Sequence, residues 1–211
     1  MEYEHRVFLS YAREQHWTPW VRNRFVPRFS AYLEKEFGRL HPDCDENERP
    51  MIFVDSQIQT GAHWEKVLKN KVARSQVMVA LVCAAYFQRE WCCREMALMM
   101  ERERYCGLEG HDENYGLLIP VRLGDGLFFP DLIKRVQYHD FEDCAYLDIP
   151  PGSEMSLRLE SNIKKLATTV AKTLLQIPDY NNGWLNFTGE DYIPLLAYKK
   201  NYNPTPFRIL P

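Results

Sequence analysis

The feature that most constrains the fold is the stretch SQVMVALV at residues 75–82, which is apolar at both odd and even positions. A strand with one face in water alternates apolar and polar residues, whereas a strand covered on both faces is apolar almost throughout. Such strands lie in the middle of parallel sheets. Residues 75–82 therefore predict a central strand with helices on both sides of the sheet.

Strand-like and helix-like segments alternate along the rest of the chain. Short apolar segments predict further strands at 6–10, 51–55, 116–123 and 136–141. Between and after them, apolar residues recur at helical spacing within 18–38, 64–72, 91–105 and 159–174. This order predicts parallel strands joined by right-handed crossovers, and so an open, doubly wound α/β sheet of five strands.

The first of these helices carries its own boundary signals. Thr18 is expected to cap it, and Pro19 suits its first turn. Pro27 lies inside the apolar pattern and predicts a kink or a break, and Gly38 is expected to end the helix.

The last part of the chain differs from the rest. We assign residues 1–177 to one domain and residues 178–211 to a C-terminal extension with no helical period. The extension holds seven aromatic residues, among them Tyr180, Trp184 and Tyr192, which is too many for a solvated linker. It is expected either to pack over its own domain as a strap or to dock on another subunit.

Composition excludes several classes of protein. The net charge of −3 gives no general attraction to nucleic acid or to an acidic membrane. The basic residues of 66–74 have the spacing of a solvated helix face. The longest apolar run, 77–87, is too short to span a bilayer, and the N-terminus lacks a secretory core, so a cytoplasmic location is expected.

The six cysteines give no sign of a disulfide framework or a zinc site, because their spacing is irregular and contains no C-x-x-C pair. Reduced thiols are expected. The polar stretch HPDCDENE at 41–48 predicts a solvent-exposed loop rather than a metal site.

Ligands of doubly wound sheets bind at the carboxyl ends of the strands, which brings residues 10–14, 55–61 and 84–95 together. Trp91 and Glu95 lie four residues apart just after the central strand, so they share a helix face. That pair fits a ligand site, but also a Trp that fills a gap and a Glu that favours a helix N-terminus. The chain has no Gly-rich phosphate loop. The neighbouring thiols of Cys92 and Cys93 have no nearby His to activate them and are expected to be small buried side chains.

Two stretches resemble Toll/interleukin-1 receptor (TIR) domains. VFLSYARE resembles the family's first strand and turn. The segment from IFVDSQIQTG to WCCREM resembles its second strand, BB loop, third strand and W-C-x-x-E segment, in the family's order. The resemblance covers residues 6–105 well and continues to about 176 by element order. It implies a flavodoxin-like fold. Ala84 and Ala85 stand where many members have a Ser, so one hydroxyl contact of the family is in doubt.

The resemblance implies an activity as well. Many TIR domains cleave NAD+ with the glutamate of this segment, which makes Glu95 the implied catalytic residue and NAD+ a substrate rather than a cofactor, with no metal. It also implies substrate contacts by the following residues: Trp91, Ser10, Tyr11, Arg13, Asp55 and Gly61. Asp55 begins the BB loop, and Gly61 lets that loop move.

Freestanding proteins of this plan resemble the TIR components of Thoeris-type anti-phage systems, in which an ADP-ribose-derived product signals to a separate effector. The resemblance therefore implies self-association and an effector that responds to the product. The main alternative is a scaffold that acts through TIR–TIR association. A nucleoside-deoxyribosyltransferase-like enzyme and a response regulator share the layout. The start FLSYARE argues against the first, and the missing acidic cluster and phosphoacceptor Asp argue against the second.

Overall fold

The computed structural model describes residues 2–14, 17–42, 52–54, 64–108, 116–124, 126, 129–134 and 136–196. Asp55 and Gly61, most of the 41–48 loop and the last fifteen residues, 197–211, lie outside this set.

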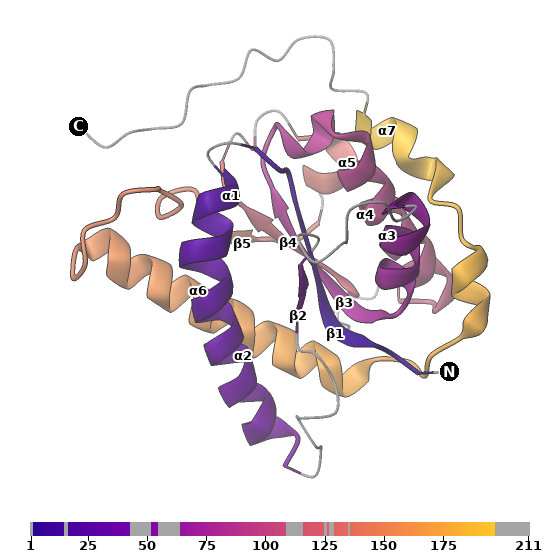
Figure 1. The fold of residues 1–211 in the computed structure, drawn as a ribbon, viewed down its shortest axis with the longest axis horizontal. Coiled ribbons are helices and arrows are strands. Elements are labelled where there is room, and N and C mark those ends of the chain that lie inside the picture. The colour runs from indigo at the N-terminus through magenta and orange to yellow at the C-terminus, as the bar shows by residue number, and fades with distance from the viewer. Residues whose placement is uncertain are drawn as a thin grey trace.

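A parallel sheet forms the centre of the molecule (Figure 1). Within the described residues it has five strands in the order β2-β1-β3-β4-β5. They are β1 (His5–Tyr11), β2 (Ile52–Val54), β3 (Ser75–Val82), β4 (Leu118–Arg122) and β5 (His139–Asp140). All four strand pairings are parallel. This is the doubly wound, flavodoxin-like order, so the predicted fold class is confirmed, with β3 at the centre.

Helices cover both faces of the sheet. α2 packs against α6 on one face, and α3 and α4 pack together on the other (Figure 1). The helical elements are α1 (Trp17–Trp20), η1 (Val21–Phe25), α2 (Val26–Leu40), α3 (Trp64–Ala73), η4 (Tyr86–Gln88), α4 (Glu90–Tyr105), α5 (Asp131–Lys134), α6 (Glu154–Thr173), η6 (Leu174–Gln176), η7 (Asn182–Asn186), η8 (Glu190–Tyr192) and α7 (Ile193–Leu196).

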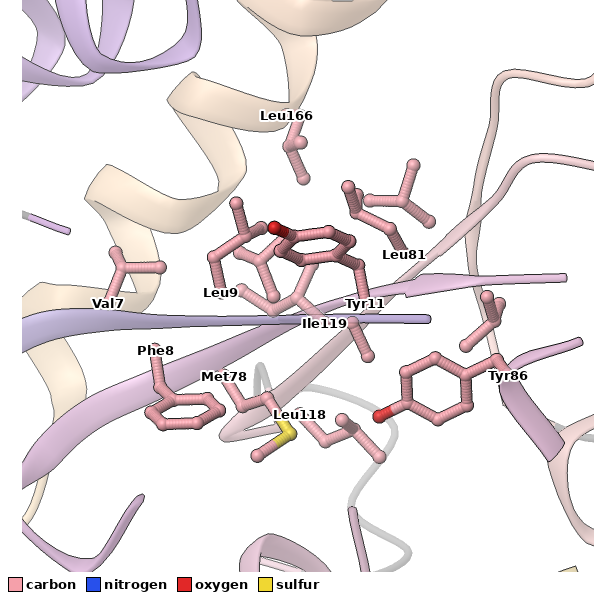
Figure 2. Packing of buried hydrophobic residues seen from close by; sticks show 14 of the residues in the cluster. Val7, Phe8, Leu9, Tyr11, Met78, Leu81, Tyr86, Leu118, Ile119 and Leu166 are labelled. Carbon is pink, nitrogen blue, oxygen red and sulfur yellow. The ribbon is translucent and has the colours of Figure 1, made fainter. Parts of the chain in front are cut away.

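Alternation along β1 sends its side chains to opposite faces of the sheet (Figure 2). Leu9 and Tyr11 lie on the side of Leu166 from α6, whereas Phe8 lies on the other side, as does Tyr86. Each of these side chains is buried. Both faces of the central strands are thus sealed, which explains why β3 is apolar throughout.

The first helical region differs from its predicted boundaries. α1 begins at Trp17, so Thr18 lies inside the helix instead of capping it. Pro27 has no N–H to donate to the preceding turn, and the irregularity predicted there occurs as the π-helical turn η1 just before α2.

Gly38 does not end the helix, and that prediction is wrong. α2 continues to Leu40, and the N–H of His41 bonds to the carbonyl of Phe37 at 2.8 Å. Leu40 packs against the core, and its burial offsets the cost of about 1 kcal/mol that Gly adds inside a helix.

Residues 178–196, which we call the C-terminal strap, lie along the α3 and α4 side of the domain (yellow end of the colour bar in Figure 1). η7 packs on α3, while η8 and α7 pack on α4. Trp184 and Leu195 are buried there. The division at residue 177 remains a prediction.

No helix in the described part of the chain is long and apolar enough to cross a membrane. The five described cysteines form no disulfide with one another. The described residues also contain no group of three or more His, Cys, Asp or Glu side chains placed to hold a metal ion.

Candidate functional site

Glu95 is placed by the connection that follows the central strand. β3 ends at Val82, the short η4 turn follows, and α4 begins at Glu90. Arg89 is extended and accepts the N–H of Cys93 at 3.1 Å, which sets the direction of the helix. Glu95 therefore lies in the second turn of α4, and it faces inward with only 5% of its surface exposed.

One hydroxyl group bonds to the carboxyl group of Glu95, and a second hydroxyl contacts the first. Ser10 on β1 donates from Oγ to Oε2 of Glu95 at 2.6 Å. The same Oγ lies 2.7 Å from the hydroxyl of Tyr86, which also donates to the carbonyl of Cys92 at 3.0 Å. This chain of contacts is buried and joins β1, η4 and α4 at the carboxyl edge of the sheet.

The chain contains three contacts, but the two hydroxyls supply only two protons. Ser10 donates its proton to Glu95, so the proton of Tyr86 serves its contacts with Ser10 and with the carbonyl of Cys92. Burial raises the pKa of Tyr86 well above its usual value, so its hydroxyl stays a donor at any physiological pH. In this arrangement the Glu95 carboxyl group is the acceptor at the end of the chain of contacts.

Tyr86 is the residue of this site that sequence reasoning missed. The sequence places Ala84 and Ala85 where the family often has a Ser, and both are buried without a hydroxyl. A hydroxyl is present one residue further along, on Tyr86. A tyrosine shortly after a buried strand was the available signal, because a buried Tyr hydroxyl needs a partner.

Trp91 lies four residues before Glu95 and is half-buried against the core. The guanidinium carbon of Arg94 lies 5.0 Å from the centre of the Trp91 ring and 4.6 Å from that of Tyr192 in the strap. Arg94 also pairs with Glu90 at 2.7 Å. The ring of Trp91, which we call the aromatic wall, therefore has a cation beside it.

The other predicted substrate contacts are not all brought to Glu95. The side chain of Tyr11 lies on the opposite face of the sheet from Tyr86 (Figure 2), and its buried hydroxyl has no hydrogen-bond partner in the described part of the chain. Arg13 is exposed just beyond the end of β1. Asp55 and Gly61 lie outside the described residues. Among these predicted contacts, Ser10 forms a hydrogen bond with Glu95 in the described part of the chain.

Cys92 and Cys93 are buried, and their thiols lie near backbone carbonyls. Sγ of Cys92 lies 3.6 Å from the carbonyl oxygen of Tyr11, and Sγ of Cys93 lies 3.7 Å from that of Phe87. These contacts are those of small core side chains, as the sequence predicts.

Comparison with known proteins gives one family and several structures. The family model described as TIR domain matches residues 7–146. A comparison with curated proteins gives no significant match. Chains of solved structures do match, 18 of them significantly. They include the TIR domains in the structure of the activated Roq1 resistosome directly recognizing the pathogen effector XopQ. That match has 18% sequence identity and a TM-score of 0.38, and it covers 81% of this chain and 95% of that one. The family match spans about two thirds of the chain, and with the parallel sheet it shows that this protein belongs to the TIR domain family.

Proposed function

We propose that this TIR protein cleaves NAD+ between nicotinamide and ribose, with Glu95 as the catalytic carboxylate. The observation that carries the proposal is a single buried carboxyl group that accepts a hydrogen bond from Ser10, whose hydroxyl in turn contacts that of Tyr86, at the carboxyl edge of the central strands. In doubly wound sheets this edge is where ligands bind. A carboxyl group fixed in this way is preorganised, which is what electrostatic stabilisation of a transition state requires.

The reaction needs little more than that one carboxylate. The bond between ribose C1′ and the nicotinamide nitrogen breaks, its electron pair stays on the nitrogen, and nicotinamide leaves as a neutral base. Positive charge develops on the ribose as an oxocarbenium-like state, which ionised Glu95 stabilises. Because the leaving group is neutral, no general acid is needed.

Capture of the cation decides the product. Water that attacks C1′ and loses a proton gives ADP-ribose, whereas a nucleophile within the same molecule gives a cyclic ADP-ribose isomer. In this proposal Trp91 stacks on the substrate or excludes water, so its wall influences that choice.

The remaining contacts have different degrees of support. Ser10 donates a hydrogen bond to Glu95, and we propose that it contacts the nucleotide when the substrate binds. Arg13, Asp55 and Gly61 remain proposed contacts at the same edge. Tyr11 can take part through its backbone only, unless its ring leaves the opposite face of the sheet.

The proposal is tested by incubating the purified protein with NAD+ and resolving the products by chromatography and mass. Glu95→Gln keeps the size of the side chain and removes its charge, and we expect a loss of nicotinamide release of at least about 10²-fold, a usual effect of removing one electrostatic group. Glu65→Gln is the matched control, because Glu65 is an exposed residue of α3. Equal turnover by the wild type and Glu95→Gln would refute the proposal.

A second candidate function is an interaction module that recruits other TIR domains. The burial of Glu95 and its bond to Ser10 favour it, because a structural carboxylate in a core has the same contacts. The two functions differ in what Glu95→Gln does. In an interaction module the variant loses stability and self-association, measured by urea unfolding and sedimentation, and the wild type releases no nicotinamide.

We further propose that the enzyme acts in the cytoplasm, associates with copies of itself through TIR–TIR contacts and signals to a separate effector in anti-phage defence of the Thoeris type. The TIR family of this chain supports the setting. The test adds the products formed by the wild type or by Glu95→Gln to candidate effectors. Only the products of the wild type are expected to activate an effector.

A further inference from the structure

The C-terminal strap is anchored at one end by a buried cation. Arg102 on α4 is 1% exposed and forms no ion pair within the described part of the chain. Its guanidinium donates to the carbonyl of Ser75 at 2.5 Å and to the hydroxyl of Tyr3 at 2.8 Å. Its positive charge lies 4.1 Å from the centre of the Trp184 ring, so the strap supplies the aromatic face that faces this cation.

The middle of the strap approaches α4 so closely that only glycine fits. Gly189 has φ of +64°, and a Cβ there would lie 2.8 Å from Cγ of Leu98 and 2.9 Å from the carbonyl oxygen of Arg94. Its N–H bonds to Glu101 at 3.3 Å. The strap is therefore built against the backbone of α4 and does not merely rest on its side chains.

The far end of the strap reaches the first turn of α4, beside the proposed site. The hydroxyl of Tyr192 lies 3.3 Å from Glu90 and 3.4 Å from Arg94, and its ring lies under the same guanidinium that covers Trp91. The side chain of Arg94 thus contacts both an aromatic ring of the strap and the aromatic wall, Trp91.

We infer that the C-terminal strap positions this wall and that Tyr192 is a positioning residue for Trp91, acting through Arg94. The inference about catalysis rests on the proposed function. The inference about the strap does not, because it concerns contacts between residues of the chain itself. Without Tyr192, Arg94 loses one of its two aromatic rings and a hydroxyl contact, so it is less firmly fixed beside the Trp91 ring. Substrate would then have to order that ring on binding, which weakens affinity.

The test compares Tyr192→Ala and Tyr192→Phe with Asp191→Ala. Asp191 is the matched control, because it lies in the same turn and pairs with Arg104 at the other end of α4, at 2.9 Å. For NAD+ cleavage we expect Tyr192→Ala to raise KM by about three- to tenfold with a smaller change in kcat, from the loss of a cation–π contact and its hydrogen bonds. Tyr192→Phe keeps the ring, so its KM is expected to lie between those of the wild type and Tyr192→Ala. The KM of Asp191→Ala is expected to match that of the wild type.

Hydrogen exchange at the amides of Cys93, Arg94 and Glu95 gives a second measurement that needs no turnover. If the strap has this role, exchange at these amides is about three- to tenfold faster in Tyr192→Ala than in the wild type, and it is unchanged in Asp191→Ala. Unchanged exchange in Tyr192→Ala, or equally fast exchange in both variants, overturns it. If the wild type releases no nicotinamide, the proposed function fails. The exchange comparison still decides whether the strap holds the start of α4. An unchanged KM in an active Tyr192→Ala enzyme also overturns the positioning role.

Discussion

Removal of one hydroxyl, in Tyr86→Phe, tests the hydrogen-bond chain at Glu95 most cleanly. The ring of Tyr86 is fully buried and packs on Phe87, and the substitution leaves that packing in place. What is lost is the contact of the hydroxyl with Ser10 at 2.7 Å and its bond to the carbonyl of Cys92 at 3.0 Å. The variant therefore isolates the polar role of the side chain.

The expected cost follows from the two contacts that the hydroxyl makes. A buried hydrogen bond contributes about 1 kcal/mol net. The substitution removes one contact with Ser10 and one with the carbonyl of Cys92, whereas Ser10 keeps its bond to Glu95. We therefore expect the free energy of unfolding to fall by about 2 kcal/mol, and Tm to fall by roughly 4–8 °C for a chain of this length.

The assay is urea unfolding followed by circular dichroism, with Tyr146→Phe as control. Tyr146 is half-buried against the core, and its hydroxyl makes no hydrogen bond within the described part of the chain, so its removal is expected to be nearly neutral. A double-mutant cycle with Ser10→Ala is expected to give a coupling energy of about 1 kcal/mol. If Tyr86→Phe costs less than about 0.5 kcal/mol, as an ordinary surface substitution does, the hydroxyl chain does not exist as described.

Two further predictions concern stability away from the site. Trp184→Ala is expected to lower the free energy of unfolding by about 4 kcal/mol, because it empties a buried aromatic position and removes the ring that faces Arg102. A loss below about 1 kcal/mol in urea unfolding would show that the strap contributes little to the fold. Burial, with Lys71 nearby, lowers the pKa of His5 to about 4. The unfolded chain therefore binds more protons than the folded chain between pH 4 and its ordinary value of 6.5, and stability falls as the pH falls through that window. His5→Asn is expected to remove on the order of 2–3 kcal/mol of this decline, and an unchanged pH profile of the urea midpoint would contradict the assignment.

The fold was predictable because its signals are local. The apolar stretch at 75–82 predicts a central parallel strand from its composition alone, and β3 occupies that position. Alternation of strands and helices predicts the doubly wound order. Helix boundaries were less predictable: Gly38 is a frequent helix end, but the packing of Leu40 against the core extends α2 past it. Tertiary packing outweighs a local stop signal there.

The site was predictable only in part. The spacing of Trp91 and Glu95 places both on one helix face, and the TIR resemblance assigns Glu95 its role. The hydroxyl of Tyr86 reaches Ser10 across 76 positions of the sequence, and no local pattern contains such a distance. Tyr11 shows the converse, since its neighbour Ser10 reaches Glu95 while strand alternation sends the Tyr11 ring to the other face.

The contacts of the strap could also be predicted only in part from the sequence. Its aromatic content predicts packing, and Trp184 is buried accordingly. Nothing in the pattern of α4 indicates that Arg102 is the buried cation to which this ring binds, because arginine at that position fits a solvated helix face equally well. The choice between the two depends on Tyr3 and Trp184, which come from opposite ends of the described chain.

The central claim is that Glu95 makes this protein an NAD+-cleaving enzyme. Its most direct test is nicotinamide release from NAD+ at high protein concentration, for the wild type beside Glu95→Gln of equal measured stability. We expect release by the wild type, almost none by the variant, and a second product with the mass of ADP-ribose or of its cyclic isomer. Equal release by both proteins, or no release by a self-associated wild type, would contradict it.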